Sequence, residues 1–171
     1  MRTALAAFPV SRALGLSTVT EAGHLMQLTR MGFSNCYLVR EEDGLTLVDT
    51  SLRGSARMII SAAERIGSPI RRILITHPHV DHVGSLDALL ARLPAAEVMM
   101  SDRDARLMRG DFSRPPGELD GRVVRSSFAR TKTTPTRRLV AGERVWVARG
   151  DRGTRSHARA AGRSWTLATE R

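Results

Sequence analysis

Alternating apolar and polar residues predict β-strands through the first half of the chain. Residues 24–29, 34–40 and 45–50 place apolar side chains at every second position or in short unbroken runs. Successive side chains of a strand point to opposite faces, so this pattern is typical of strands in a sheet. The polar turn at residues 41–44 ends in glycine and predicts a hairpin between the second and third strands. Residues 72–76 and 97–100 predict two further strands.

Helical spacing of apolar residues appears between these strands. It predicts a helix over residues 53–66, where Ala56, Ile59, Ile60, Ala63 and Ile66 recur at intervals of about one turn. Gly67, Ser68 and Pro69 follow this run and indicate its end. Leucines predict a second helix face over residues 86–93, and residues 102–109 predict a short third helix. The apolar residues of the segment 110–138 show neither strand nor helix spacing.

The residues that carry chemistry follow the strand predicted at 72–76. Three of the five histidines and one aspartate fall within residues 77–82 (HPHVDH). Extended backbone sends alternate side chains to one face, so we expect His77, His79 and Asp81 to converge, while His82 projects to a second position. Pro78 favours that extended conformation. We refer to His77, His79, Asp81 and His82 as the histidine cluster.

Imidazole and carboxylate groups at this spacing predict a metal site, or two adjacent sites. The donors suit Zn²⁺, at about 2.0 to 2.2 Å, and Mn or Fe accept similar ligands. The alternative is a polar loop in which the histidines form ordinary hydrogen bonds. Close clustering of His and Asp favours the metal.

Residues 77–82 resemble the H-x-H-x-D-H motif of the metallo-β-lactamase-fold hydrolases. Residues 34–39 and 45–50 resemble the early strands of that family, and residues 73–84 resemble its strand-loop-helix element; the resemblance covers about 20–145. It implies that His77 and His79 bind the first metal, and that Asp81 and His82 bind the second. Asp81 would also orient the nucleophile or move a proton as the catalytic residue. Asp49, at the end of its strand, would have a supporting role.

The resemblance implies an α/β (α+β) fold, with a mixed sheet and flanking helices, that is the first half of an αββα sandwich. At 171 residues the chain is long enough for little more than that half. We expect a lead-in segment at 1–20, a partial metallo-β-lactamase-like domain at 21–145 and an irregular, Arg-rich tail at 146–171. Half a sandwich predicts an uncovered apolar sheet face, through which the chain would associate with itself.

The expected family pattern stops near Val145. Residues 146–171 contain six arginines and no apolar period, where the family would show a strand and a P-G-H-T-P-G loop with the third histidine of the first metal site. A shift of reading frame by one nucleotide would explain this. Codons for residues 154–160 (TRSHARA) can be chosen so that the next frame reads P-G-H-T-P-G. His157 lies near the missing ligand, but it lacks the Pro-Gly turn, so we assign it no ligand role.

The resemblance implies a hydrolase in which a metal-activated water attacks an ester, thioester, lactone, phosphoester or amide of a small-molecule substrate. With its ligand set incomplete, we expect impaired activity. A non-catalytic truncated relative is the first alternative. A basic module that binds or cleaves nucleic acid is the second.

Charge and composition bear on partners and location. The net charge of +10 would suit nucleic acid, but Lys132 is the only lysine beside 26 arginines, and aromatic residues make up only 4% of the chain. We therefore expect no specific nucleic-acid partner. Cys36 is the only cysteine, which excludes an internal disulfide and fits a reducing compartment. No secretory leader or membrane-spanning run is apparent, so we expect a cytoplasmic location.

Overall fold

A computed structural model of the chain describes residues 7–8, 17–113, 127–140, 143–149, 155–161 and 164–170. Eleven strands and four helices lie in these ranges. The strands form two sheets, one of eight strands and one of three. No helix among the described residues is long and apolar enough to cross a membrane.

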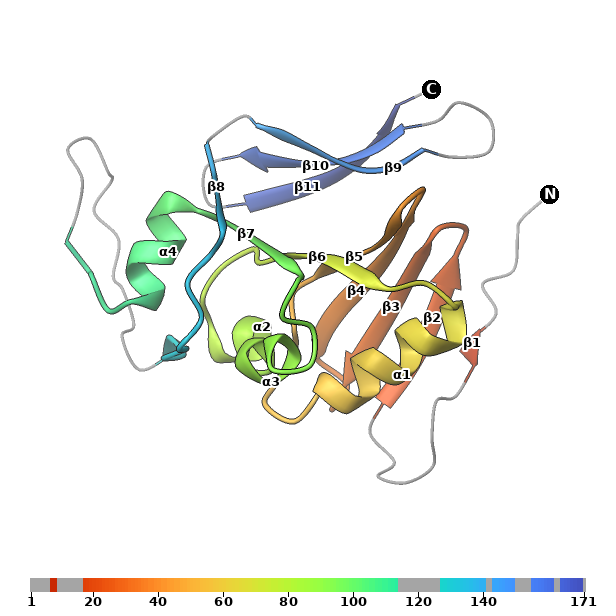
Figure 1. The fold of residues 1–171 in the computed structure, drawn as a ribbon, viewed down its shortest axis with the longest axis horizontal. Helices are drawn as coiled ribbons and strands as arrows, with labels where there is room; N and C mark the ends of the chain where they lie inside the picture. Colours follow the sequence, from red (N-terminus) through yellow and green to blue (C-terminus); the bar gives the residue numbers. More distant parts are fainter. Residues whose placement is uncertain are drawn as a thin grey trace.

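The larger sheet is mixed, and its strands follow one another in chain order from β1 to β8 (Figure 1). Strands β1 to β5 pair antiparallel, whereas β5 to β8 pair parallel. The change at β5 places the carboxyl ends of β5 and β6 at one edge of the sheet. The bounds of the eight strands are Ala7–Phe8, Ser17–Ala22, Leu25–Arg30, Ser34–Glu41, Gly44–Val48, Ile70–Leu74, Glu97–Ser101 and Arg137–Leu139.

Four helices connect or flank the parallel strands. They are α1 (Ala56–Ile66), α2 (Val80–Val83), α3 (Leu86–Leu90) and α4 (Asp102–Met108). Helix α1 ends at Gly67, whose φ of 75° lets its N–H bond the carbonyls of Ala63 and Glu64. Helix α4 begins at Ser101, whose hydroxyl accepts a hydrogen bond from the backbone N–H of Asp104 at 3.1 Å. The positions of α1, α3 and α4 agree with the apolar spacing of the sequence.

Neighbouring residues of the central strands contribute to two different cores. Leu47 and Ile73 face α1 and α3, where they join Ile59 and Leu89 in the larger core. The residues next to them, Val48 and Leu74, face away from the helices and are also buried. The sheet is therefore covered on both faces, as near-continuous apolar strands require.

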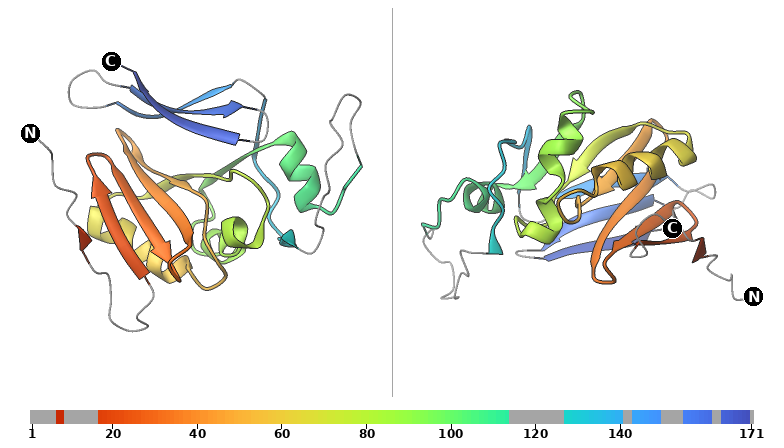
Figure 2. Two further views of the ribbon diagram at one scale, coloured as in Figure 1. Left: turned by 180° about the vertical axis from the view of Figure 1, so that it is seen from behind. Right: turned by 90° about the horizontal axis from the view of Figure 1, so that it is seen from below.

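The second sheet contributes to covering the far face. It consists of β9 (Arg144–Arg149), β10 (Arg155–Ala161) and β11 (Ser164–Glu170), which pair antiparallel. Val145 of β9 is buried in one cluster with Val39, Val48, Leu74, Met99 and Leu139. Three views place this sheet and helices α1 and α3 on opposite sides of the larger sheet (Figures 1 and 2).

The structure corrects two expectations about the end of the chain. The tail at 146–171, predicted to be irregular, is β-strand through most of its described residues. The apolar sheet face, predicted to be uncovered, is buried at Val39, Val48, Leu74 and Met99. Both errors have one cause. The many arginines of this segment hide short alternating stretches such as Val145 and Val147, and strands need alternation only where one face is buried. Self-association stays a prediction, but an uncovered sheet face no longer supports it.

The start of the chain also differs from expectation. The segment at 1–20, expected as a lead-in before the domain, contains β1 and the first four residues of β2. Strand β2 pairs with β3 along its whole length, from Ser17 opposite Arg30 to Ala22 opposite Leu25. Its residues are mainly small or polar, so pairing with β3, and not an apolar pattern, defines it.

Candidate metal centre

The histidine cluster follows strand β6 at the carboxyl edge of the sheet. Asp49, which directly follows β5, lies beside it: the Asp49 N–H donates to the carbonyl of Leu74 at 2.8 Å. Asp49 and Ser51 both have positive φ, of 59° and 57°. A non-glycine residue in this region is uncommon and is often found at functional sites. The backbone therefore turns sharply where the side chain of Asp49 meets the cluster.

The path of the backbone through the cluster differs from the extended one predicted. His79 is extended, with φ −73° and ψ 153°, but it caps helix α2, which carries Asp81 and His82. The amides of His82 and Val83 donate to the His79 carbonyl at 2.9 and 3.0 Å. Alternation along a strand therefore does not bring Asp81 to the site. The turn of helix α2, which begins after His79, brings Asp81 to the site instead.

The four side chains of the cluster nevertheless lie together. The ring centroids of His77 and His79 are 4.6 Å apart, and those of His77 and His82 are 3.8 Å apart. Nε2 of His82 lies 3.5 Å from Oδ2 of Asp81. The three imidazoles thus lie close together, and Asp81 lies beside His82, whereas the sequence predicted that His82 would project to a separate position.

Asp49 and Thr76 form the support beneath the rings. Asp49 is 3% exposed, and its Oδ1 accepts hydrogen bonds from the backbone N–H of Thr76 at 2.9 Å and from the Thr76 hydroxyl at 3.0 Å. Its Oδ2 lies 2.7 Å from Nδ1 of His82. Thr76 Oγ1 also lies 3.0 Å from Nδ1 of His77. Asp49 therefore lies next to the cluster, at the position where the resemblance implied a supporting role.

Helix α2 is fixed by residues that carried no signal in the sequence. The N–H and the hydroxyl of Thr50 donate to the His82 carbonyl at 2.6 and 2.9 Å. The Ser34 hydroxyl donates to the Asp81 carbonyl at 2.9 Å. Gly84 ends the turn so close to the 52–53 backbone that an added Cβ would lie 2.5 Å from the Arg53 nitrogen. Only the position of Asp49 and Thr50 at the end of the strand predicted at 45–50 could have indicated this role.

Aromatic residues from the unpatterned 110–138 region approach the cluster from another side. Phe128 forms an isolated β-bridge with His79, and their ring centroids are 4.9 Å apart. Phe112 packs edge-on against Phe128 at 5.6 Å. The Ala129 N–H donates to the Pro78 carbonyl at 3.1 Å. Phe128 and Ala129, which lie between α4 and β8, therefore border the site, although no sequence pattern indicated a role for them.

The environment shifts the pKa values of two cluster histidines in opposite directions. Burial lowers the pKa of His77, and the neighbouring His82 lowers it further. Burial also opposes the charged form of His82. The hydrogen bond and charge of Asp49, with the charge of Asp81, outweigh burial and raise the pKa of His82. Neutral imidazole is the form that binds metal, and the lowered pKa favours this form at His77.

The side chains of the histidine cluster are of chemical types that bind divalent metal ions. Imidazole nitrogen and carboxylate oxygen are ligands that zinc, manganese and iron accept. Among the residues that the structure describes, however, no three His, Cys, Asp or Glu side chains are arranged so that they would hold an ion together. His157 lies in β10, and its side chain is outside the described part of the chain. The described residues therefore do not by themselves form a complete metal site.

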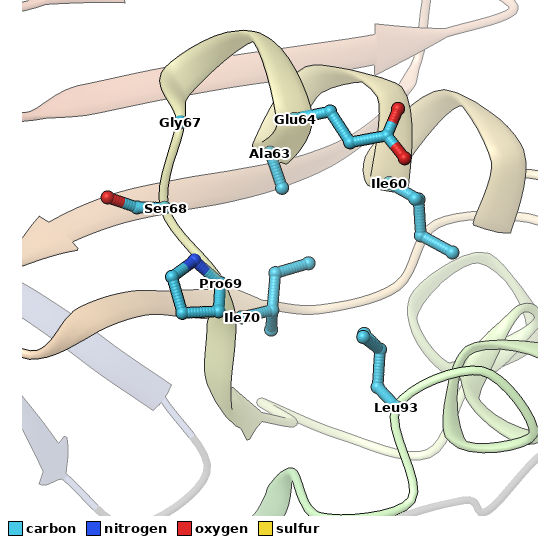
Figure 3. A pocket seen from close by; sticks show the side chains of 8 residues that line it. All are labelled: Ile60, Ala63, Glu64, Gly67, Ser68, Pro69, Ile70 and Leu93. Atoms are coloured by element: carbon cyan, nitrogen blue, oxygen red, sulfur yellow. The ribbon is translucent and has the colours of Figure 1, made fainter.

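A separate hollow lies at the opposite end of β6. It has a volume of about 320 Å³ and is bounded by the end of α1, the start of β6 and Leu93 (Figure 3). Ile60, Ala63 and Ile70 make its wall mainly apolar, and Glu64 is its one ionisable group. It contains no histidine, so the candidate site remains at the carboxyl edge of the sheet, where α/β proteins usually bind ligands.

Comparison with known proteins identifies a family. The family model described as "Metallo-beta-lactamase superfamily" matches residues 29–160. The match thus continues past residue 145, where the resemblance in the sequence was expected to end. The solved structure of BJP-1, a subclass B3 metallo-beta-lactamase of Bradyrhizobium japonicum, aligns with a TM-score of 0.58 and 21% identity, over 86% of this chain and 58% of that one. It shares the fold.

Two curated relatives match in sequence. "Uncharacterized protein YobT" of Bacillus subtilis (strain 168) is 43% identical over 111 residues, which are 65% of this chain and 48% of that protein. "Hydroxyacylglutathione hydrolase" of Chromohalobacter salexigens is 32% identical over 88 residues, 43% of this chain and 33% of that protein. This chain therefore spans half or less of the length of these relatives.

Proposed function

Because the chain belongs to the metallo-beta-lactamase superfamily, we propose that it derives from metal-dependent hydrolases and that its histidine cluster binds a divalent ion. The observation that carries this proposal is the meeting of three imidazoles and one carboxylate at the end of β6, above the buried Asp49. Packing alone gives no reason to gather these groups. A hydrolase among the curated relatives supports the same class of reaction.

Zinc is the preferred ion, and manganese or iron is acceptable to the same donors. His77 and His79 would hold a first ion, and Asp81 with His82 a second. Once bound, such an ion supplies Lewis acidity, which lowers the pKa of water to about 7 and polarises the bond to be cut. The substrate would be a small molecule with an ester, thioester, lactone, phosphoester or amide bond.

The chain's own residues would position the reactants and move a proton. The side chain of Asp81 is 35% exposed, and its Oδ2 lies 3.5 Å from Nε2 of His82. It would orient the attacking water and accept its proton. Phe128, packed on His79, would exclude water from one side of the site.

The described donors are too few for tight binding. His77 and His79 provide two ligands for the first ion, where structural and catalytic zinc sites use three or four protein ligands. The sequence has no P-G-H-T-P-G loop to supply the third. We therefore propose weak metal binding and little or no turnover by this chain.

Metal analysis of the purified chain tests the proposal. The protein is stripped with a chelator, titrated with Zn²⁺ and then dialysed. We expect saturable binding in the titration and loss of most zinc on dialysis. The double variant His77→Ala/His79→Ala should lose the saturable binding, whereas His24→Ala, outside the cluster, should retain it. Equal binding by all three proteins would overturn the site, and one or two zinc ions per chain retained after dialysis would overturn its proposed weakness.

A panel of chromogenic substrates separates an impaired hydrolase from a non-catalytic relative. Ester, thioester, lactone, phosphodiester and β-lactam probes are incubated with the zinc-loaded chain. Slow turnover that the double variant lacks supports the hydrolase. Zinc binding without turnover of any probe supports the non-catalytic relative. A cytoplasmic location and the absence of a specific nucleic-acid partner remain proposals.

A further inference from the structure

We propose that Thr76 is a positioning residue that fixes the tautomer of His77, so that Nε2 of this imidazole is free of a proton and available to a metal. The inference rests on the proposed function only for its last step, the metal. The hydrogen bonds lie within the chain alone and connect Asp49, through the Thr76 hydroxyl, to the ring of His77.

The first step is the direction of the hydrogen bond between Thr76 and Asp49. An ionised carboxylate only accepts hydrogen bonds. Thr76 Oγ1 lies 3.0 Å from Oδ1 and 2.8 Å from Oδ2 of Asp49. A hydroxyl has one proton to donate, and this proton is directed to the carboxylate. The backbone N–H of Thr76 binds the same carboxylate at 2.9 Å, which holds the side chain in place.

The second step is the contact between Thr76 and His77. Oγ1 lies 3.0 Å from Nδ1 of His77. Because its proton is already donated to Asp49, the hydroxyl oxygen can only accept here, so Nδ1 of His77 must carry the proton. In a neutral imidazole the other nitrogen, Nε2, is then an unprotonated acceptor. The hydroxyl thus determines which nitrogen of His77 is available as a ligand.

The same carboxylate sets the tautomer of a second imidazole. Nδ1 of His82 lies 2.7 Å from Oδ2 of Asp49, so this nitrogen donates and Nε2 is left without a proton in the neutral ring. Nε2 of His82 is also the nitrogen that lies near Asp81. Asp49 therefore acts on His82 directly and on His77 through Thr76. In their neutral forms, both rings would present an Nε2 without a proton to an ion.

Nuclear magnetic resonance of the metal-free chain tests this directly. Long-range 1H–15N spectra of histidine-labelled protein, recorded at a pH where His77 is neutral, distinguish the two tautomers. We expect the wild-type His77 to carry its proton on Nδ1. Thr76→Val, which keeps the shape but removes the hydroxyl, should shift His77 towards the Nε2–H tautomer. Thr76→Ser should restore the wild-type spectrum, and His24 serves as an internal reference.

Zinc titration of the same proteins measures the consequence. Loss of an outer partner of a metal-binding histidine typically weakens binding by 10- to 100-fold, so we expect about tenfold weaker binding in Thr76→Val and recovery in Thr76→Ser. A proton on Nε2 of wild-type His77 would overturn the inference even if no variant folds. So would a Thr76→Val spectrum identical to that of the wild type. If wild-type protein binds no zinc but shows the expected tautomer, the metal proposal fails and the role of Thr76 in fixing the ring stands.

Discussion

Nδ1 of His82 lies 2.7 Å from Oδ2 of Asp49, although the two residues are 33 positions apart in the chain. Asp49 directly follows β5, and His82 lies in helix α2, which comes after β6. Parallel pairing of β5 and β6 brings their carboxyl ends together and makes this contact possible. The site is therefore a product of the sheet's topology, with a buried carboxylate beneath it.

Replacing Asp49 by Asn should lower the pKa of His82. Asn tolerates the positive φ at this position, but it removes the negative charge that raises the pKa. A raised histidine pKa stabilises the fold below the unfolded value of about 6.5, and this stabilisation is lost as the pH rises through the folded value. The stability difference between wild type and variant should therefore be larger at pH 5.5 than at pH 9. Histidine titration by nuclear magnetic resonance and urea unfolding at both pH values measure the two effects.

The matched control for Asp49→Asn is Asp102→Asn. Asp102 is an exposed carboxylate that pairs with Arg138. Its removal should leave the titration of His82 unchanged. A His82 pKa that is the same in wild type and Asp49→Asn would contradict the contact on which the site is built.

Gly84→Ala should destabilise the chain and disturb the cluster together. The added Cβ would lie 2.5 Å from both the Arg53 nitrogen and the Val80 carbonyl, which are backbone atoms that cannot move independently. Overpacking of this kind costs about 1–3 kcal/mol. Gly110→Ala is the comparison: its φ of 84° is unfavourable for alanine, but nothing lies within 4 Å. Both variants should lose stability, and only Gly84→Ala should shift the resonances of His82.

Asp87→Asn should loosen the loop after Phe128. The Asp87 carboxylate accepts hydrogen bonds from the N–H groups of Lys132 and Thr133 and from the Thr133 hydroxyl, at 2.6 to 3.0 Å. Burial opposes ionisation, but these hydrogen bonds outweigh it and lower the pKa of Asp87. We expect a loss of about 1–2 kcal/mol at neutral pH, since hydrogen bonds to a charged group contribute about that much.

The effect of Asp87→Asn should depend on pH in a defined direction. A lowered carboxyl pKa stabilises the fold above the unfolded value of about 3.9, and this is lost as the pH falls through the folded value. Urea unfolding of both proteins from pH 7 down to pH 3 should therefore show the difference shrinking with acidity. A constant difference over this range would assign the loss to packing and not to the charge.

Met99→Ala tests whether the far face of the sheet is covered. Met99 is fully buried in the cluster that contains Val145. Truncating a buried methionine costs about 2–5 kcal/mol, whereas Val140→Ala, at a residue 67% exposed, should cost less than about 0.5 kcal/mol. Urea unfolding compares the two. A loss at Met99 as small as that at Val140 would mean that β9 does not pack on this face.

Much of the α/β fold could be predicted because local patterns agree with it. The hairpin of β4 and β5 and helix α1 follow from alternation, a glycine turn and helical spacing. Strand β2 could not be predicted, because its sequence is mainly small and polar and its partner defines it. The second sheet could not be predicted either, since its packing depends on residues distant in sequence, such as Val145 on Leu74.

The residues that gather at the candidate site could be predicted from the sequence, whereas most of the residues that hold them in place could not. Residues 77–82 are dense enough in His and Asp to stand out in any sequence. Thr76, Thr50 and Ser34 are common residues whose roles appear only when β4, β5 and β6 are placed side by side. The altered reading frame near Val145 stays a prediction, and sequencing of the gene across that codon would decide it.

The most direct test of the central claim is the anomalous diffraction of a crystal of this chain grown with Zn²⁺, measured at the zinc absorption edge. We predict an anomalous peak within about 2.0 to 2.2 Å of imidazole nitrogens of His77 and His79. A zinc-saturated crystal with no peak there, and with the imidazoles of the cluster turned away from one another, would contradict it.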